Sequence, residues 1–326
     1  MSTKATVLKA LQSNLKNYVS GEELSNTLGI SRAAVWKAIK ALREDGYRIE
    51  AVTNKGYSLL PDEKYITVEA LRNALPARYR KNDVFIYDTL DSTNAKAKQM
   101  ALEKSPHGTV IMARQQTHGR GRLGRSFCSP REGIYMSIVI RPSFDMSKSV
   151  LVTSAAAVAV SDAISQVCGL PAKIKWVNDV YVHDKKVCGI LTEAITDFEM
   201  GTIESLAIGI GLNTSVACFP AELKDIAGAL EGDYSPAQLG AAVIGNLLDL
   251  MDSLESRDFI KIYRERSLVL GKTVKVFKKG YNTDSSHDVL GIPARVLDID
   301  RDGGLVVLYT NGTQETLNTG EISIRL

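Results

Sequence analysis

The sequence predicts a multidomain α+β protein with an N-terminal winged helix-turn-helix, a central α/β region built on a mixed sheet, and a small C-terminal β-barrel. Three observations support this prediction. Residues 1–60 show helical periodicity followed by two short strand patterns, residues 65–265 interleave apolar strands with amphipathic helices, and the chain beyond residue 270 contains only short strands separated by turns. A chain of 326 residues is also longer than most single domains.

The N-terminal segment begins with three predicted helices. Apolar residues at helical spacing predict the first helix over residues 3–16. Residues 20–23 (Ser-Gly-Glu-Glu) form a capping box that opens the second helix, Gly29 ends that helix, and Ser31 can cap the third. Two short strand patterns follow and form the predicted wing, at residues 47–52 and 57–60.

The third helix carries a basic stripe, Arg32, Trp36, Lys40 and Arg43, on a different face from its apolar residues. Residues 1–60 contain nine Lys or Arg against five acids, whereas the whole chain has a net charge of only +3. The basic excess therefore lies entirely in this segment and indicates a polyanion partner for it. A helix-turn-helix with a basic outer face is typical of DNA binding, although a three-helix protein-interaction module with a solvated basic face is the alternative. The residues expected to contact DNA are Glu22, Ser31, Arg32, Ala33, Trp36, Lys37, Lys40 and Lys55.

The rest of the chain divides at two predicted boundaries. A Pro-Asp-Glu-Lys linker at residues 61–64 separates the first domain from a central one, and the strand-only pattern separates the central domain from the last. The expected domains are residues 1–62, 63–268 and 269–326.

Strands are expected in the central domain at residues 84–87, 110–113, 134–140, 173–176, 180–183, 187–193 and 206–212, and helices at residues 66–75, 92–103, 150–167 and 236–253. A hairpin at Asp184 and Lys185 joins two strands directly, which predicts a mixed or antiparallel sheet. In the last domain, strands are expected at residues 273–277, 290–299, 304–309, 314–317 and 322–325.

Residues 115–125 (Gln-Gln-Thr-His-Gly-Arg-Gly-Arg-Leu-Gly-Arg) are the most informative stretch of the central domain. They hold three arginines and three glycines within seven residues, between two predicted strands. Glycine lets the backbone approach a ligand, and the guanidinium fork matches phosphate or carboxylate oxygens. Such a loop cannot bury itself, so we expect it to be mobile alone and to close over an anion. The alternatives are a merely solvated loop and non-specific nucleic-acid binding.

Two nucleotide-binding fingerprints match only formally. The spacing of Gly119, Gly121 and Gly124 fits the dinucleotide motif, but a polar run precedes the glycines and Pro130 follows them, so no strand-loop-helix unit forms. The Gly271-Lys272-Thr273 stretch lacks the upstream glycine of a P-loop, because that position is Arg266. Both interpretations are rejected.

Several classes of protein are disfavoured by composition. The four cysteines are widely spaced and only four histidines occur, so disulfides and a structural zinc are not expected and a reducing cytoplasm fits. No uncharged apolar run approaches 18 residues, since the longest, at residues 150–160, is short and rich in alanine and serine. The N-terminus has no signal-peptide core. No Ser/His/Asp arrangement, metal cluster or carboxylate pair indicates hydrolysis.

Polar clusters end several central strands, and in this order they resemble one family over essentially the whole chain. One cluster is residues 115–125, called the arginine loop from here on. The others are residues 91–94 (Asp-Ser-Thr-Asn), 175–179 (Lys-Trp-Val-Asn-Asp), 186–191 (Lys-Val-Cys-Gly-Ile-Leu) and 209–213 (Gly-Ile-Gly-Leu-Asn). Together, behind a winged helix, they resemble the bifunctional biotin–protein ligase and biotin operon repressor family. The resemblance implies a central domain like that of class II synthetases and an SH3-like C-terminal domain.

The resemblance also implies substrates, partners and residue roles. Biotin and ATP with Mg²⁺ would form biotinyl-AMP. Biotin would then pass to a lysine of the biotin carboxyl carrier protein of acetyl-CoA carboxylase or a similar enzyme. A homodimer promoted by the adenylate would repress transcription at the biotin operator. Arg122 and Lys186 would be catalytic. The residues implied to bind biotin or its adenylate are Ser92, Thr93, Asn94, Gln116, Gly119, Arg120, Gly121, Arg122 and Lys186. Those implied to lie near the nucleotide are Arg125, Phe127, Asn178, Asp179 and Asn213, with Asp179 the candidate Mg²⁺ ligand.

Two positions depart from the family pattern. Val177 stands where the family has proline, and Phe127 stands where it has tryptophan. If residue 127 stacks on adenine, phenylalanine offers a smaller face and weaker nucleotide binding is expected. Two other functions stay open from the residues: a repressor that senses a small molecule without turnover, and a lipoate-type acyl ligase.

Overall fold

The chain folds into two compact units, Met1–Tyr65 and Ile66–Leu326. The computed structural model describes residues 3–14, 17–44, 47–60, 66–142, 149–196, 203–216, 219–223, 225–277, 291–318 and 321–323. The predicted linker at residues 61–64 lies outside the described residues, as does Leu15 of the first predicted helix.

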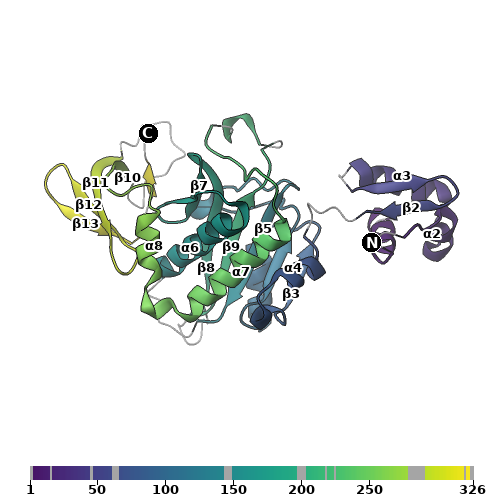
Figure 1. Ribbon diagram of the computed structural model, residues 1–326, viewed down its shortest axis with the longest axis horizontal. Coiled ribbons are helices and arrows are strands. Elements are labelled where there is room, and N and C mark those ends of the chain that lie inside the picture. Colours follow the sequence, from purple (N-terminus) through teal and green to yellow (C-terminus); the bar gives the residue numbers. More distant parts are fainter. Residues whose placement is uncertain are drawn as a thin grey trace. The chain divides into compact units, whose positions relative to one another are not determined.

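The smaller unit has the predicted helix-turn-helix and hairpin (Figure 1). Its elements are α1 (Thr3–Gln12), α2 (Gly21–Leu28), α3 (Arg32–Glu44), β1 (Ile49–Val52) and β2 (Gly56–Leu59). The two strands pair antiparallel. Val7, Leu11, Leu24 and Ile39 lie in a core that belongs to this unit alone.

The predicted caps of α2 and α3 are confirmed. The Ser20 hydroxyl accepts a hydrogen bond from the Glu23 amide at 3.0 Å, and Gly29 ends α2 in the left-handed region with φ of 64°. The Ser31 hydroxyl accepts a hydrogen bond from the Ala34 amide at 3.2 Å at the start of α3. These bonds satisfy amides that have no partner within the helix, so the short turn between the helices is fixed locally.

A seven-stranded mixed sheet forms the centre of the larger unit, with the order β3-β4-β5-β9-β8-β7-β6. Strand β3 is parallel to β4, and the other neighbouring pairs are antiparallel, as predicted from the hairpin at Asp184. The strands are β3 (Val84–Tyr87), β4 (Val110–Ala113), β5 (Gly133–Ile140), β6 (Lys173–Lys175), β7 (Asp179–Val182), β8 (Lys185–Thr196) and β9 (Ile203–Asn213).

Helices cover both faces of this sheet. On one face lie α4 (Val68–Ala74), α6 (Ser149–Cys168), α7 (Pro236–Asp252) and α8 (Phe259–Glu265), which share one large core with the sheet (Figure 1). On the other face lies α5 (Thr93–Leu102), whose Ala97 and Ala101 pack on Val139 and Ala207. Apolar side chains of β5 contribute to the cores on both faces of the sheet, because successive side chains of a strand point to opposite faces. Helix α8 was not predicted from the sequence.

Helix α6 confirms the helix predicted at residues 150–167, which contains the apolar run at residues 150–160. The helix continues to Cys168, and its segment Val150–Cys168 is long and apolar enough, by length and composition alone, to cross a membrane. Within the fold, 72% of that window is buried. Because a helix that is apolar all round also suits the core of a large domain, we assign α6 to the core.

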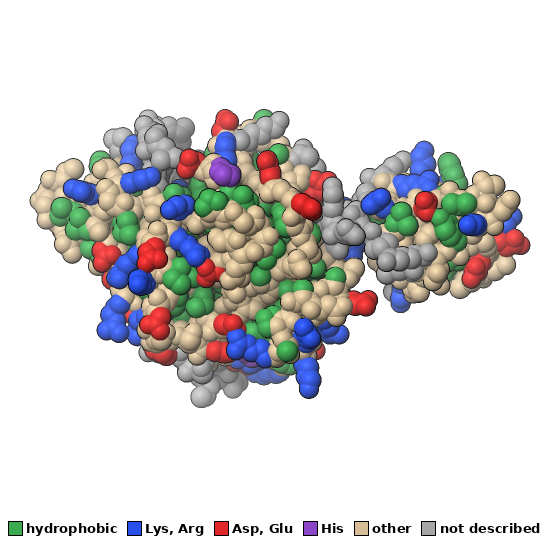
Figure 2. All heavy atoms as spheres, viewed as in Figure 1, with side chains coloured by type: hydrophobic (Ala, Val, Ile, Leu, Met, Phe, Trp, Pro, Cys, Tyr) green, Lys and Arg blue, Asp and Glu red, His purple; other side chains and the backbone are tan. Residues whose placement is uncertain are grey.

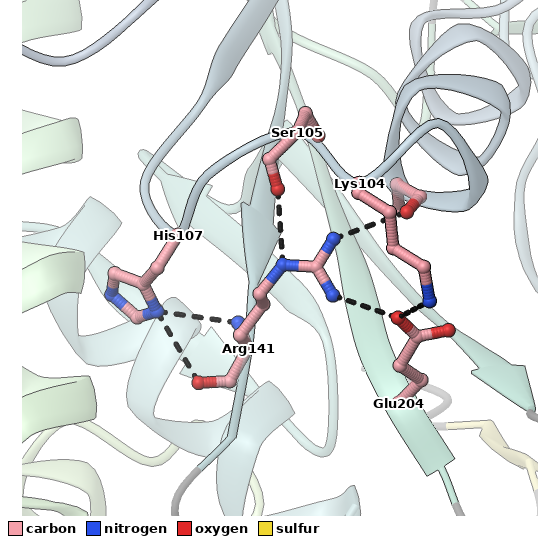
Figure 3. A network of polar contacts seen from close by, with 6 residues as sticks. Lys104, Ser105, His107, Arg141 and Glu204 are labelled. Atoms are coloured by element: carbon pink, nitrogen blue, oxygen red, sulfur yellow. Dashed lines mark hydrogen bonds and ion pairs between the residues drawn. The ribbon is translucent and has the colours of Figure 1, made fainter.

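The end of α5 is fixed to the sheet by a polar network (Figure 3). The Arg141 guanidinium donates to the carbonyl oxygens of Ala101 at 3.1 Å and Ser105 at 3.0 Å, and pairs with Glu204 at 3.0 Å. Hydrogen bonds from Lys104 and Arg141 lower the pKa of Glu204. The network therefore holds the last turn of α5, and with it the position of the helix whose first turn carries Ser92, Thr93 and Asn94.

The C-terminal strands form a five-stranded antiparallel sheet with the order β13-β12-β11-β10-β14. They are β10 (Thr273–Phe277), β11 (Ile292–Ile299), β12 (Leu305–Tyr309), β13 (Gln314–Leu317) and β14 (Glu321–Ser323), close to the predicted positions. The turn between β11 and β12 is attached to the central sheet, because the Trp176 indole donates to the Gly303 carbonyl at 2.9 Å. Over the visible face of the larger unit, Lys and Arg alternate with Asp and Glu (Figure 2).

Because the cores of the two units are separate, a substitution that leaves a cavity in one core should not change the stability of the other unit. Leu11 is fully buried in the smaller unit, so Leu11→Ala should lower that unit's free energy of unfolding by about 2–5 kcal/mol. Calorimetry of the full chain should then record one transition at lower temperature and the other unmoved. Leu248→Ala, at a fully buried site in the larger unit, should do the reverse. A shift of both transitions by either variant would contradict the division.

Candidate functional site

A cavity of about 280 Å³ opens between the arginine loop and the strands β7, β8 and β9. Its walls come from five places: the first turn of α5, the loop at residues 116–127, the β6–β7 turn with the start of β7, strands β8 and β9, and Ile226 in the segment before α7. Of the predicted site residues, those that line it are Ser92, Thr93, Asn94, Gln116, Arg120, Gly121, Arg122, Arg125, Phe127, Asn178, Asp179 and Lys186. These residues are far apart in the sequence, and the sheet brings them together.

The arginine loop is folded back on itself over the cavity. Its two arms are joined by backbone hydrogen bonds from the Phe127 amide to the Gly119 carbonyl at 2.8 Å and from the Gly121 amide to the Arg125 carbonyl at 2.7 Å. The tip is a single 3₁₀ turn with Leu123 and Gly124 at positive φ, and no α-helix follows before β5. Rejection of the dinucleotide motif is therefore confirmed.

Arg122 reaches across the cavity to the β6–β7 turn. Its Nη1 donates to Asn178 Oδ1 at 3.2 Å, and Asn178 Nδ2 donates in turn to the Ile190 carbonyl at 2.9 Å. A loop arginine is thus attached to the edge of the sheet opposite the loop. Because a guanidinium group has several N–H donors, one arginine can serve both this attachment and an anion in the cavity.

The polar floor of the cavity is built on the first turn of α5. Ser92 caps the helix by accepting from the Ala95 amide at 3.4 Å. Asn94 is buried, donates to the Leu191 carbonyl at 3.1 Å, and accepts from the Ser137 hydroxyl at 2.7 Å. Gly209 makes this approach possible, because a Cβ there would lie 2.3 Å from Asn94 Oδ1.

Ser137, Glu193 and Lys98 support this floor, and sequence reasoning missed all three. Asn94 Nδ2 donates to Glu193 Oε2 at 2.8 Å, and Lys98 Nζ lies 2.7 Å from Glu193 Oε1. Burial opposes ionisation of Glu193, but hydrogen bonds from Lys98 and Asn94 outweigh it, so the pKa of Glu193 is lowered. The charged carboxylate thereby fixes the orientation of the Asn94 amide.

Lys186 and Asp179 form an ion pair at 2.7 Å inside the cavity. They lie on neighbouring strands, β8 and β7, with side chains only one-fifth to about one-quarter exposed. Tyr181 also lines the cavity, and its burial, with the nearby Asp179 charge, raises its pKa to about 12. In this part of the cavity, Asp179 offers carboxylate oxygens and Asn178 offers an amide oxygen. Among the described residues, no group of three or more His, Cys, Asp or Glu could hold a metal ion alone.

Phe127 packs on the sheet from inside the cavity. Its ring covers Gly189 and Gly211, which pair across β8 and β9, and a Cβ on Gly211 would lie 2.5 Å from the ring. The ring also makes an edge contact with Tyr135, with 6.4 Å between centroids. The other departure from the family pattern, Val177, is buried and follows a cis peptide bond at Trp176–Val177.

Two predicted residues lie outside the cavity lining. Gly119 belongs to the outgoing arm of the loop and packs on the returning arm, where a Cβ would lie 2.4 Å from the Phe127 carbonyl oxygen. Asn213 is buried behind Lys186 and donates to the Gly228 carbonyl at 3.1 Å. Conversely, Ile226 lines the cavity although no pattern in the sequence indicated it.

In the smaller unit, every residue predicted to contact DNA is exposed. The Lys40 ammonium lies over the Trp36 ring at 5.9 Å, and Lys55 lies over Tyr18 at 5.7 Å. Arg32 pairs with Glu22 at 2.9 Å. Arg43, which the helical stripe placed on the basic face, donates to the Ile49 carbonyl at 2.7 and 2.9 Å and so holds the hairpin on α3.

Comparison with known families matches three parts of the chain. Residues 3–58 match an HTH domain, residues 86–213 match the biotin/lipoate A/B protein ligase family, and residues 292–325 match the biotin protein ligase C terminal domain. The order of the three matches follows the order of the helix-turn-helix, the mixed sheet and the C-terminal strands.

Relatives match over nearly the full length. The chain is 34% identical over 317 residues to the bifunctional ligase/repressor BirA of Bacillus subtilis, covering 94% of each chain. It is 30% identical to the Escherichia coli protein of the same name, covering 94% of this chain and 92% of that one. The solved biotin protein ligase of Aquifex aeolicus in complex with biotin and ATP is 26% identical, with a TM-score of 0.63 over 74% of this chain and 98% of that one. The chain therefore belongs to the biotin–protein ligase family, in its bifunctional ligase/repressor form with an N-terminal HTH domain.

Proposed function

We propose that the protein joins biotin to a carrier-protein lysine by way of biotinyl-AMP and represses transcription at the biotin operator. The observation that carries the proposal is the make-up of the cavity. Five cationic residues line it beside a floor of uncharged hydroxyl and amide groups: Arg120, Arg122, Arg125, Lys175 and Lys186. Cations suit a carboxylate and a phosphate, and neutral donors and acceptors suit the ureido ring of biotin.

In the first step, the biotin carboxylate attacks the α-phosphorus of ATP. A bond forms between the carboxylate oxygen and phosphorus, and the bond from phosphorus to the bridging oxygen breaks, so pyrophosphate leaves. No protein nucleophile is required, and catalysis consists of positioning two anions and stabilising charge. We assign that stabilisation to Arg122 and Lys186, with Lys186 exchanging its partner Asp179 for the substrate.

In the second step, the amine of a carrier-protein lysine attacks the carbonyl carbon of the mixed anhydride. The carbon–oxygen bond to AMP breaks, an amide forms, and the nitrogen loses a proton. The carrier is the biotin carboxyl carrier protein of acetyl-CoA carboxylase or of a similar carboxylase. Because water would attack the same carbonyl carbon, we propose that the arginine loop is mobile without ligand, opening and closing, and becomes ordered in the closed position over the adenylate. Equal protease sensitivity of the loop with and without biotin and ATP would contradict this ordering.

The donor set at the β6–β7 turn fits a magnesium ion that arrives with the nucleotide. Asp179 and Asn178 offer the hard oxygen ligands that Mg²⁺ prefers, and Mg²⁺ is usually held by one or two protein ligands together with phosphates. When bound, the ion would neutralise phosphate charge. We further propose that Arg125, Phe127 and Asn213 belong to the nucleotide side of the site, and that Ser92, Thr93, Asn94, Gln116, Gly119, Arg120 and Gly121 belong to the biotin side.

The finer features of the fold and assembly are proposals as well. We propose domain limits of residues 1–62, 63–268 and 269–326, a central domain of the class II synthetase type, an SH3-like C-terminal barrel and a cytoplasmic location. One winged helix covers only a short stretch of DNA, so we propose that biotinyl-AMP, as corepressor, promotes a homodimer that reads two half-sites. Identical dimerisation constants with and without biotinyl-AMP in sedimentation would rule out that switch.

The function is tested by incubating the protein with ATP, Mg²⁺, biotin and a biotin carboxyl carrier domain. Mass spectrometry of that domain should record the mass of one biotin on its acceptor lysine, and pyrophosphate should be released. A sensor without turnover would bind biotin and release no pyrophosphate. Modification by lipoate instead of biotin would identify a lipoate-type ligase.

We expect the Arg122→Gly variant to bind the biotinyl-AMP intermediate less tightly than wild type. The variant loses both the hydrogen bond to Asn178 and a cation in the cavity, so biotinyl-AMP should dissociate at least about 10-fold faster while still forming. Release is measured by chasing radiolabelled adenylate from the protein. Arg131→Gly is the control, because Arg131 pairs with Asp88 and does not line the cavity. Tight retention of adenylate by Arg122→Gly would show that the assignment is wrong.

Operator binding should depend on the exposed lysines of the smaller unit. Lys40→Gln removes one expected ammonium–phosphate interaction per protomer, so affinity should fall uniformly across operator sequences. The slope of log affinity against log salt should become shallower by about one for each phosphate that is no longer neutralised. Fluorescence anisotropy with operator DNA at several salt concentrations measures both. Lys104→Gln, in the larger unit, should change neither the operator affinity nor the salt slope. An unchanged slope for Lys40→Gln would show that Lys40 does not contact DNA.

A further inference from the structure

Ser129 joins the biotin side of the cavity to the returning arm of the arginine loop. Its side chain is buried, with 6% exposure, and does not line the cavity. Its hydroxyl accepts a hydrogen bond from Gln116 Nε2 at 2.9 Å and donates one to the Phe127 carbonyl at 3.0 Å. The same hydroxyl therefore touches a residue on each side of the loop.

The orientation of the Gln116 amide is fixed at both ends. Its Oε1 accepts from the Thr93 amide at 2.8 Å and from the Thr93 hydroxyl at 3.1 Å, while its Nε2 donates to Ser129. Since Gln116 lines the cavity, it presents its second N–H to the interior only while this arrangement holds. A continuous series of hydrogen bonds thus runs from the first turn of α5 through Gln116 and Ser129 to Phe127.

Close packing leaves this series little freedom. A Cβ at Gly119 would lie 2.6 Å from the Ser129 hydroxyl and 3.1 Å from Gln116 Nε2. Glycine at 119 therefore lets the outgoing arm of the loop lie directly on the two polar groups. The backbone bond from the Gln116 amide to the Ser129 carbonyl, at 3.1 Å, closes the base of the loop beside them.

We propose that Ser129 is a positioning residue that couples the Gln116 amide to closure of the arginine loop. The proposal rests on the proposed function, in which Gln116 belongs to the biotin side of the site. Loss of the Ser129 hydroxyl leaves the Phe127 carbonyl and the Gln116 amide without their shared partner. The loop then opens more often, and the adenylate escapes through it.

The first experiment uses the full-length protein without ligand. The loop holds arginines 120, 122 and 125, so trypsin cleavage there reports how often it opens. Ser129→Ala should be cleaved about 3- to 10-fold faster than wild type, as expected for loss of the hydroxyl that makes the hydrogen bonds to Gln116 and Phe127. Ser129→Cys, with a weaker donor of similar size, should give an intermediate rate and serves if the alanine variant fails to fold.

Ser161→Ala is the matched control for a merely structural effect. Ser161 is also buried, donates to a carbonyl (Val158, 3.0 Å) and accepts from a side-chain nitrogen (Arg266, 2.6 Å), but it lies in α6 outside the cavity lining. It should lower the melting temperature and leave cleavage of the loop unchanged. Equal acceleration by both variants would overturn the proposal.

The second experiment measures biotinyl-AMP dissociation and a double-mutant cycle. Ser129→Ala should raise the dissociation rate about 3- to 10-fold, and in a Gln116→Ala background the same change should add little, because Ser129 acts through Gln116. Additive effects, or a wild-type dissociation rate in Ser129→Ala, would overturn the proposal. If wild type forms no adenylate, the proposed function fails, and the same cycle on trypsin cleavage still decides the coupling.

Discussion

A loop of arginines and glycines cannot bury itself, so its shape must come from hydrogen bonds to rigid neighbours. Residues 119–125 contain no apolar side chain except Leu123, which is 62% exposed. The loop is held instead at its base by Gln116 and Ser129, between its arms by backbone bonds, and across the cavity by Arg122 on Asn178. Each bond contributes only about 1 kcal/mol in water, so the closed state is stabilised enough to form and weakly enough to open.

The sheet supplies the rigidity that the loop lacks. Glycines at 189, 209 and 211 remove side chains from the middle of β8 and β9; Asn94 fills the space over Gly209, and Phe127 fills the space over Gly189 and Gly211. Beneath them, the Glu193 carboxylate, Ser137 and Lys98 fix the Asn94 amide. The cavity therefore combines a fixed floor with a movable cationic roof, which suits a reaction that must admit two anions and then exclude water.

Periodicity located nearly every element of the fold, since alternation and helical spacing are local properties of the sequence. Helix α8 escaped because its seven residues span too few turns for its buried Phe259, Ile260 and Tyr263 to reveal a period. Motifs located most of the cavity lining. They could not identify Ser137, Glu193 or Lys98, whose bonding partners lie between 43 and 99 residues away. Arg43 lies on the basic stripe of α3, and its bond to the nearby Ile49 carbonyl is a role that helical spacing alone does not reveal.

The central claim is that the arginine loop closes on the activated biotin, and a crystal structure of the protein with biotinyl-AMP tests it most directly. We expect guanidinium nitrogens of Arg120 and Arg122 to lie about 2.7–3.2 Å from oxygen atoms of the adenylate, beneath a closed loop. A structure with the adenylate bound in the cavity, the loop away from it and both arginines turned to solvent would contradict the account.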